Sequence, residues 1–216
     1  KAWLDMGVDG FRLDVATGYF KDDKFRSNPF KPRLVPDLLQ DHVYDRNRPE
    51  VHEVFREFRR IADSYGERVL IAETHGQSAA LAASCYGESL DELHMAFNFD
   101  FLTQPWGARA FRDSARRWYE SLPPGAWPNF TLSNHDQARH IHRYRKGAAT
   151  EERARVAAAL LLTLRGTPFL YYGEEIGMRC VRLPRSVLQD PLGLRTWPLG
   201  FGRDPERTPM QWDDSP

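Results

Sequence analysis

Gly10-Phe11-Arg12-Leu13-Asp14-Val15 is the stretch that decides the fold, because an apolar strand ends in it on a carboxylate. Two further strand-like segments end in a similar way. Val69-Leu70-Ile71-Ala72 is closed by Glu73, and Thr131-Leu132-Ser133 runs into Asn134-His135-Asp136. Active sites of barrels and of open α/β sheets lie at the carboxyl ends of the parallel strands. The sequence therefore predicts one constellation of three carboxylates.

Strand-like and helix-like segments alternate along the chain, which predicts βα units and a parallel sheet. The expected strands are 8–15, 68–73, 93–102, 129–133 and 168–172, and the expected helices are 50–65, 108–122 and 151–165, the last with Thr150 as its N-cap. The strand over 93–102 is expected to place Phe97, Phe99 and Phe101 on one face. Residues 17–49 are predicted to form a long irregular loop. Five strands are too few to close a (β/α)8 barrel, so we expect an α/β fold that is either a partial barrel or a barrel whose other strands lie outside this sequence.

Composition narrows the class of partner. Lys and Arg together number 30, as do Asp and Glu, and this balance argues against nucleic acid or an anionic membrane surface as a partner. No apolar run is long enough to span a bilayer. Cys85 and Cys180 fit no metal or redox motif, so we expect free thiols in a reducing, cytoplasmic compartment. The oligomeric state is left open.

Five segments match, in order, the segments of one known family: residues 10–15, 71–73, 133–139, 166–175 and 203–212. The chain resembles the α-amylase superfamily, glycoside hydrolase family thirteen, and within it the α-glucosidase and oligo-1,6-glucosidase branch. The resemblance implies that residues 1–216 form the C-terminal part of a catalytic barrel, approximately strands four to eight. It also implies that the third-strand segment of the family lies outside this chain, and that the chain by itself is inactive.

The resemblance and the chemistry of carboxylates assign three catalytic roles. Asp14 is the expected nucleophile of a retaining glycosidase, and Arg12, on the same face of the strand, favours its ionised form. Arg12 is also a candidate for substrate binding, through a sugar hydroxyl. Glu73 follows four apolar residues, so we expect partial burial to hold it protonated as the general acid/base. Asp136 is expected to bind ring hydroxyls and to favour an oxocarbenium-like sugar, and His135 to donate to a hydroxyl of the same sugar.

Four more residues are candidates for substrate binding. Phe97 either walls the first subsite or packs in the core. Arg139 is expected either to pair with Asp136 or a substrate oxygen, or to form a surface salt bridge. Arg203 matches a family arginine near the pocket. Val15 follows the nucleophile directly, and the linkage that a valine accompanies there, α-1,6 or α-1,4, differs among relatives.

The sequence predicts no cofactor and no metal site. His75, His94, His140 and His142 have no metal-ligand spacing. Glu174 and Glu175 are expected to be solvated loop charges rather than residues at the mouth of the pocket.

The leading expectation is a retaining, exo-acting α-glucosidase that hydrolyses terminal α-linked glucose from α-glucoside oligosaccharides through a covalent glycosyl-enzyme intermediate. One alternative is a glucosyl-transferring or isomerising member of the family, such as a trehalose synthase or sucrose isomerase, which keeps water from that intermediate. The other is a non-catalytic amylase-like module. Modules of that kind often lack the catalytic carboxylates and carry a transmembrane helix.

Overall fold

The computed structural model describes residues 1–31, 40–74 and 78–213, so His75 and residues 32–39 of the predicted loop lie outside the described part. The chain divides into two compact units. The first is Lys1–Asp100 with Asp113–Asn129, and the second is Phe101–Arg112 with Phe130–Pro216. Among the described residues, no helix has both the length and the apolar character needed to cross a membrane.

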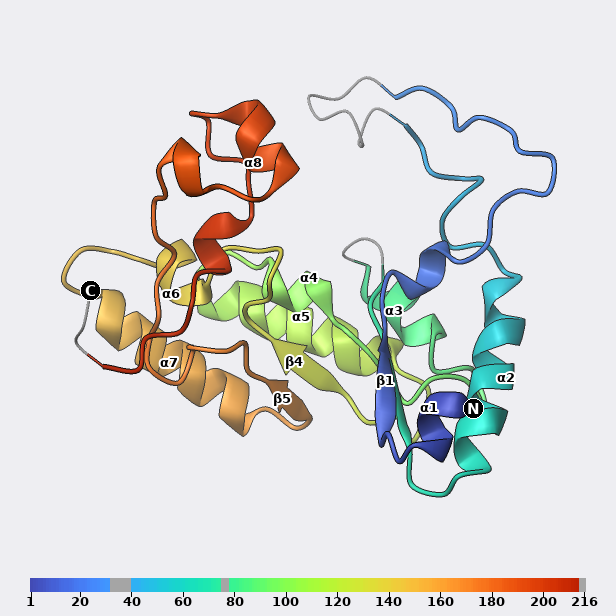
Figure 1. Ribbon diagram of the computed structural model, residues 1–216. Helices are drawn as coiled ribbons and strands as arrows, with labels where there is room; N and C mark the ends of the chain where they lie inside the picture. Colours follow the sequence, from blue (N-terminus) through green and yellow to red (C-terminus); the bar gives the residue numbers. More distant parts are fainter. Residues whose placement is uncertain (32–39, 75–77, 214–216) are drawn as a thin grey trace. The chain divides into compact units, whose positions relative to one another are not determined.

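Short strands and helices alternate along the chain (Figure 1). The strands are β1 (Gly10–Leu13), β2 (Val69–Ala72), β3 (Met95–Ala96), β4 (Asn129–Thr131) and β5 (Thr167–Phe169). The α-helices are α1 (Ala2–Asp5), α2 (Val51–Asp63), α3 (Ala79–Ser84), α4 (Phe99–Leu102), α5 (Ala108–Ser121), α6 (His140–Arg143), α7 (Thr150–Thr163) and α8 (Pro191–Thr196). Each of the five segments predicted as strands overlaps one of these strands, which is shorter than predicted.

The first unit is built on a parallel sheet with the strand order β1-β2-β3. Gly10 pairs with Val69, and a side chain at position 10 would place its Cβ 2.1 Å from the Val69 carbonyl oxygen. Glycine is therefore required where β1 enters the sheet. The register continues to Leu13 opposite Ala72. The residues that follow these two, Asp14 and Glu73, consequently leave the sheet at neighbouring strand ends.

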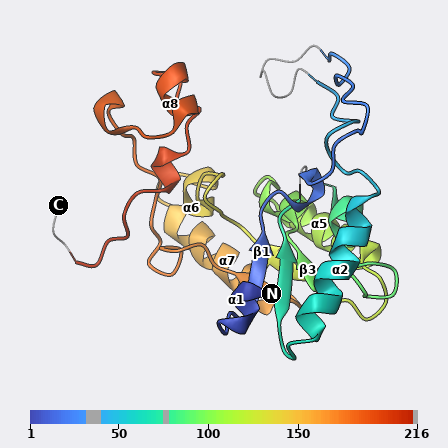
Figure 2. The ribbon, with the colours of Figure 1, turned by 45° about the vertical axis from the view of Figure 1, so that its right-hand side comes forward.

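Helix α2 packs on β2, and the two lie together in both ribbon views (Figure 2). Its apolar residues recur at helical spacing, and Val51, Phe55 and Ala62 are buried. Trp118 of α5 is fully buried in the same unit, with its ring at an edge-to-face angle to Tyr86. These contacts supply the apolar core that holds the sheet of the first unit.

The second unit has an aromatic core. The ring of Phe101 lies 4.8 Å from that of Phe130 and 5.4 Å from that of Phe111. Tyr144 joins the cluster 5.8 Å from Phe111, and Trp106 lies 5.3 Å from Tyr144. Strand β4 is hydrogen-bonded to β5, and α6 packs against α7. This core supports the loops that follow β4 and β5.

The prediction of a strand over residues 93–102 is wrong beyond Ala96. Phe97 and Phe99 stack with their rings 5.8 Å apart and nearly parallel, and the chain then turns into α4. Phe101 is buried against Phe130 instead of sharing a face with the other two. The alternation of phenylalanines imitates strand periodicity, but ring packing decides the local structure.

Helix ends also differ from the prediction. Thr150 is the first residue of α7, not its N-cap, and its hydroxyl donates to the Gly147 carbonyl. The sequence analysis missed two short helices that carry capping side chains. Ser78 accepts from the Leu81 N–H at the start of α3, and Asp190 accepts from the Leu192 N–H at the start of α8.

Candidate active site

A cation and two carboxylates meet at the carboxyl end of the parallel sheet in the first unit. Arg12 Nη1 lies 2.5 Å from Asp14 Oδ1, and Arg12 Nη2 lies 2.5 Å from Glu73 Oε2. The strand register produces this arrangement, because Asp14 and Glu73 each follow a paired strand residue. The prediction that Arg12 lies beside Asp14 is confirmed.

The two carboxylates have different surroundings. The side chain of Asp14 is 70% exposed, whereas that of Glu73 is 10% exposed. Burial raises the pKa of Glu73 above its ordinary value, and a hydrogen bond with Asp14 raises it further, while the charge of Arg12 opposes both. Glu73 therefore favours the protonated state, and an exposed, arginine-paired carboxylate such as Asp14 suits a nucleophile.

Val15 has a left-handed backbone conformation with φ of 47°. A β-branched residue rarely adopts that conformation, because its side chain crowds the backbone there. The turn brings the Val15 N–H within 3.4 Å of Glu73 Oε2, and the Ala16 N–H donates to the Glu73 carbonyl at 2.8 Å. The segment that follows Asp14 is thus tied to both the main chain and the side chain of Glu73.

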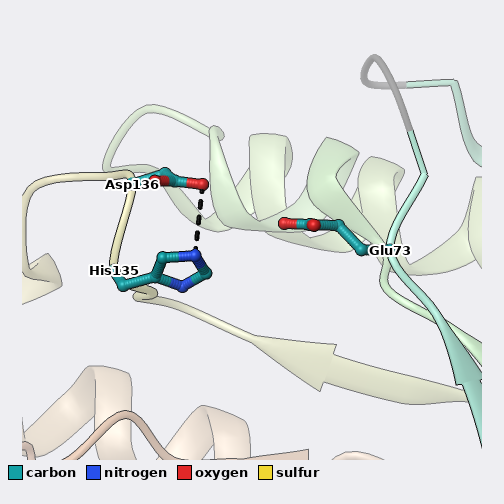
Figure 3. A group of neighbouring side chains, drawn as sticks. All are labelled: Glu73, His135 and Asp136. Carbon is teal, nitrogen blue, oxygen red and sulfur yellow. Dashed lines mark ion pairs between the residues drawn. The ribbon is translucent and has the colours of Figure 1, made fainter. Parts of the chain in front are cut away.

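The second unit holds the third carboxylate. Arg203 Nη1 donates to Asp136 Oδ1 at 2.9 Å, and Arg207 Nη2 donates to the same oxygen at 2.7 Å. The other oxygen, Oδ2, lies 3.4 Å from Nε2 of His135 (Figure 3). Glu73, drawn in the same picture, belongs to the first unit. Arg203, which the resemblance placed near the pocket, thus contacts this carboxylate, and Arg207 was not among the predicted residues.

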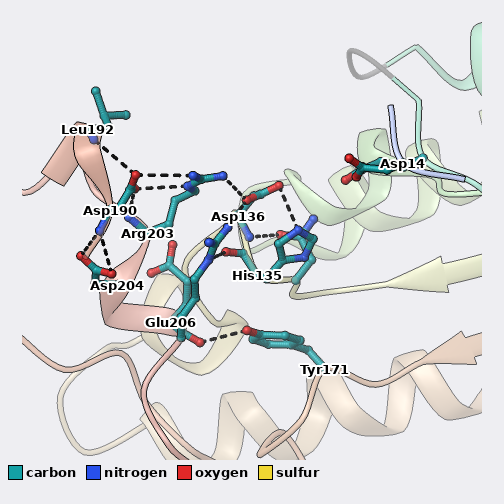
Figure 4. Close-up of polar contacts among 12 residues, drawn as sticks. Asp14, His135, Asp136, Tyr171, Asp190, Leu192, Arg203, Asp204 and Glu206 are labelled. Atoms are coloured by element: carbon teal, nitrogen blue, oxygen red, sulfur yellow. Dashed lines mark hydrogen bonds and ion pairs between the residues drawn. The ribbon is translucent and has the colours of Figure 1, made fainter. Parts of the chain in front are cut away.

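Asp190 is almost fully buried and binds both the backbone and the guanidinium of Arg203 (Figure 4). Asp190 Oδ2 accepts from the backbone N–H of Arg203 at 2.8 Å and from its Nε at 3.2 Å. The backbone N–H of Asp190 in turn donates to the carboxylate of Asp204. A chain of hydrogen bonds therefore orients the guanidinium of Arg203 toward Asp136.

The prediction of a surface salt bridge is wrong for Arg139, because its side chain is fully buried. The described hydrogen bonds of this side chain go to main-chain carbonyls and not to Asp136. The guanidinium carbon lies 4.6 Å from the ring centres of both Tyr171 and Tyr172. Its nitrogens donate to the carbonyls of Tyr172 at 2.5 Å and Glu206 at 3.1 Å. Arg139 thus joins the loop after β4 to the loops after β5.

Glu174 is also placed differently from the prediction. Its side chain is 3% exposed, and it accepts from the Tyr171 N–H and contacts His140 Nδ1 at 2.8 Å. The expectation of a solvated loop charge is therefore wrong for Glu174, whereas Glu175 is exposed. His94 accepts from the Leu70 N–H, so its Nδ1 is used inside the first unit.

Comparisons with known proteins agree with these motifs. The family model "Alpha amylase, catalytic domain" matches residues 1–216. A probable alpha-glucosidase of Rhizobium meliloti (strain 1021) is 36% identical over 99% of this chain and 41% of its own length. An oligo-1,6-glucosidase of Parageobacillus thermoglucosidasius is 31% identical over 100% of this chain and 43% of its own.

Solved structures of related enzymes also resemble this chain. An alpha-glucosyl transfer enzyme is 37% identical with a TM-score of 0.88, covering 99% of this chain and 41% of that one. An isomaltulose synthase of Erwinia rhapontici NX5, solved with its natural substrate sucrose, is 25% identical with a TM-score of 0.79, covering 99% of this chain and 43% of that one. The chain thus spans about two fifths of the length of these relatives. A partial (β/α)8 barrel fits these likenesses.

Proposed function

Because the chain belongs to the α-amylase family of catalytic domains, we propose that residues 1–216 contribute approximately strands four to eight of a glycoside hydrolase barrel. We propose further that the protein is a retaining α-glucosidase, acting on the terminal α-linked glucose of oligosaccharides. The observation that carries this proposal is the contrast between exposed Asp14 and buried Glu73, which one arginine joins. One ionised and one protonated carboxyl are what a retaining glycosidase requires.

In the first step, Asp14 attacks the anomeric carbon and the glycosidic bond breaks. Glu73 donates its proton to the departing oxygen, so the aglycone leaves as a neutral alcohol and Glu73 becomes a carboxylate. Arg12 then lies beside a newly formed negative charge at 2.5 Å and stabilises it. The product of this step is a glucosyl ester of Asp14.

In the second step, Glu73 removes a proton from water, and the hydroxide equivalent displaces Asp14 from the anomeric carbon. The stereochemistry is retained because two displacements occur at the same carbon. Asp136 is proposed to accept hydrogen bonds from ring hydroxyls and to favour the positively charged, distorted sugar in both steps. His135, Val15 and Phe97 are proposed to contact that sugar.

A second candidate is transfer of the glucosyl group to another sugar, with isomerisation as its intramolecular form. The observation that favours it is the likeness to the alpha-glucosyl transfer enzyme and the isomaltulose synthase. The covalent intermediate and the three carboxylates are the same in this reaction. The difference lies in the acceptor, which is a sugar hydroxyl instead of water.

The first test is the hydrolysis of p-nitrophenyl α-glucoside by the purified protein that contains the whole catalytic barrel to which residues 1–216 are proposed to contribute, and by its Asp14→Asn variant. We expect the variant to lose at least about a thousandfold in turnover, since removing a nucleophile typically costs that much or more. Asp9→Asn is the matched control, because Asp9 is exposed at the opposite end of β1. Full activity of Asp14→Asn would refute the assignment of the nucleophile.

The second test separates hydrolysis from transfer. Products of concentrated maltose and concentrated sucrose are identified by chromatography. Glucose as the main product from maltose supports the hydrolase. A dominant oligosaccharide or isomerised disaccharide supports transfer and displaces the hydrolase proposal.

A further inference from the structure

We propose that Arg207 is a positioning residue for Asp136, which leaves Oδ2 of Asp136 as the oxygen that meets the sugar. This inference rests on the proposed function. Arg207 donates at both ends of its guanidinium, from Nε to the His135 carbonyl at 2.7 Å and from Nη2 to Asp136 Oδ1 at 2.7 Å. One planar group therefore fixes the backbone and the carboxylate of two successive residues.

The two arginines divide the oxygens of Asp136. Arg203 and Arg207 both donate to Oδ1, while neither contacts Oδ2 within hydrogen-bonding distance. Oδ2 faces His135, whose ring is the other group expected to meet the sugar. A carboxylate that is anchored through one oxygen has a single orientation, and its second oxygen is then presented at a fixed place.

Folding stability does not explain this arrangement. The side chains of Asp136, Arg203 and Arg207 are 34%, 42% and 35% exposed, so each of them reaches the solvent. Solvent-accessible ion pairs contribute little to stability, so two guanidiniums on one oxygen of a partly exposed carboxylate have little structural benefit. Orientation of the carboxylate for a ligand accounts for the geometry.

The backbone on either side of Arg207 is fastened to the unit. The Glu206 carbonyl accepts from Arg139 Nη2 at 3.1 Å. It also accepts from the hydroxyl of Tyr171 at 3.1 Å (Figure 4). The hydroxyl of Tyr172 donates to the Thr208 carbonyl at 2.7 Å. Arg207 therefore extends from a rigid base, which is what a positioning residue needs.

The test is a double-mutant cycle with Asp136→Asn and Arg207→Ala, in the purified protein, with kcat and KM on p-nitrophenyl α-glucoside. We expect Arg207→Ala to lower kcat/KM by roughly ten- to a hundredfold, the usual effect of losing a hydrogen bond to a charged group. If Arg207 acts through Asp136, the double variant is no slower than Asp136→Asn alone. Arg207→Lys, which keeps the charge but not the two-point contact, is expected to recover only part of the loss.

Arg182→Ala is the matched control, because Arg182 is an exposed arginine of the same unit and forms no hydrogen bond or ion pair with Asp136 among the described residues. Melting curves verify that each variant is folded. Glucose affinity by calorimetry provides the same cycle where Asp136→Asn is too slow to assay.

The outcomes separate the two proposals. If the wild-type protein is active and the losses caused by Asp136→Asn and Arg207→Ala multiply in the double variant, the positioning role alone is overturned. A melting temperature that falls while kcat per folded protein is unchanged would do the same. A folded wild-type protein that contains the complete barrel but has no activity on any α-glucoside would overturn the proposed function, and this inference with it.

Discussion

The guanidinium of Arg12 lies 2.5 Å from the carboxylate of Glu73, and the pKa of that carboxyl is nevertheless raised. A neighbouring cation lowers a carboxyl pKa and burial raises it, so burial is the larger effect here. An acid/base catalyst needs both influences. In the proposed mechanism, burial favours the proton on Glu73 before it is donated, and Arg12 stabilises the carboxylate that remains.

This balance predicts a pH dependence. Turnover is expected to fall as the pH rises through the raised pKa of Glu73, because the group then lacks the proton that it donates. Arg12→Gln removes a charge that lowers this pKa, so the alkaline limb of kcat/KM is expected to move to higher pH. The control is Arg60→Gln, at an exposed arginine on α2. A limb that moves to lower pH in Arg12→Gln would contradict the assignment.

Glu73→Gln is expected to discriminate between leaving groups. An alcohol such as the glucose released from maltose needs the proton of Glu73, whereas a nitrophenolate leaves without help. We expect the variant to lose roughly a hundredfold or more on maltose, in the range of general acid catalysis, and much less in the first step with the nitrophenyl glucoside. Burst kinetics isolate that step. Equal losses on both substrates would exclude Glu73 as the acid.

Glu206 predicts a dependence of stability on pH. Burial raises the pKa of Glu206 from its ordinary value of 4.5 to about 7. The folded state therefore binds this proton more tightly than the unfolded state, and the stabilisation is complete below pH 4.5 and is lost as the pH rises through 7. The full difference is up to about 3 kcal/mol, from the free energy of one pKa unit.

The measurement is urea unfolding of Glu206→Gln and the wild type at pH 5 and pH 8. The neutral amide cannot ionise, so the variant should gain stability relative to the wild type at pH 8 and little at pH 5. Glu152→Gln, at an exposed position of α7, is the control. An equal difference at the two pH values would show that Glu206 ionises freely in the folded protein.

Substitution of Arg139 is expected to lower the stability of the fold and to leave the substrate affinity unchanged. Arg139→Ala removes two hydrogen bonds and two ring contacts in the interior, and we expect it to cost about 3 kcal/mol of unfolding free energy. Arg139→Lys should recover part, since lysine keeps the charge but not the fork. Unfolding curves and KM are measured together. Unchanged stability with a raised KM would restore the substrate role expected from the sequence.

The sequence was sufficient to place residues and helices wherever the pattern that identifies them lies within a few neighbouring residues. Asp14 and Glu73 could be placed at strand ends because each directly follows its own apolar run, and Arg12 because strand residues two apart share a face. Helix α2 was found because its apolar residues repeat at helical spacing. Helix α5 was recognised by the Pro123-Pro124-Gly125 stop that follows it, and α7 as a largely apolar segment.

The errors concern contacts that join distant parts of the chain. Arg207 reaches the Asp136 carboxylate from 71 residues away, and no local pattern distinguishes it from the other arginines of the C-terminal stretch. Arg139 and Glu174 are ionisable residues, a type that is mostly exposed in proteins. Partners far along the chain bury both of them, and the local sequence does not reveal these partners. Phe101 has the spacing of a strand residue, and only its packing on Phe130 reveals otherwise.

At Val15, the requirements of folding stability and of turnover conflict. Glycine or asparagine would adopt its left-handed backbone at lower cost and would relieve strain on the order of 1–3 kcal/mol. The same turn aims a backbone N–H at Glu73 and follows the residue proposed to carry the glucosyl group. Engineering for heat resistance would begin by replacing this valine, which keeps the backbone N–H at Glu73 but removes the side chain proposed to contact the sugar. Durability and turnover are therefore opposed at a single residue.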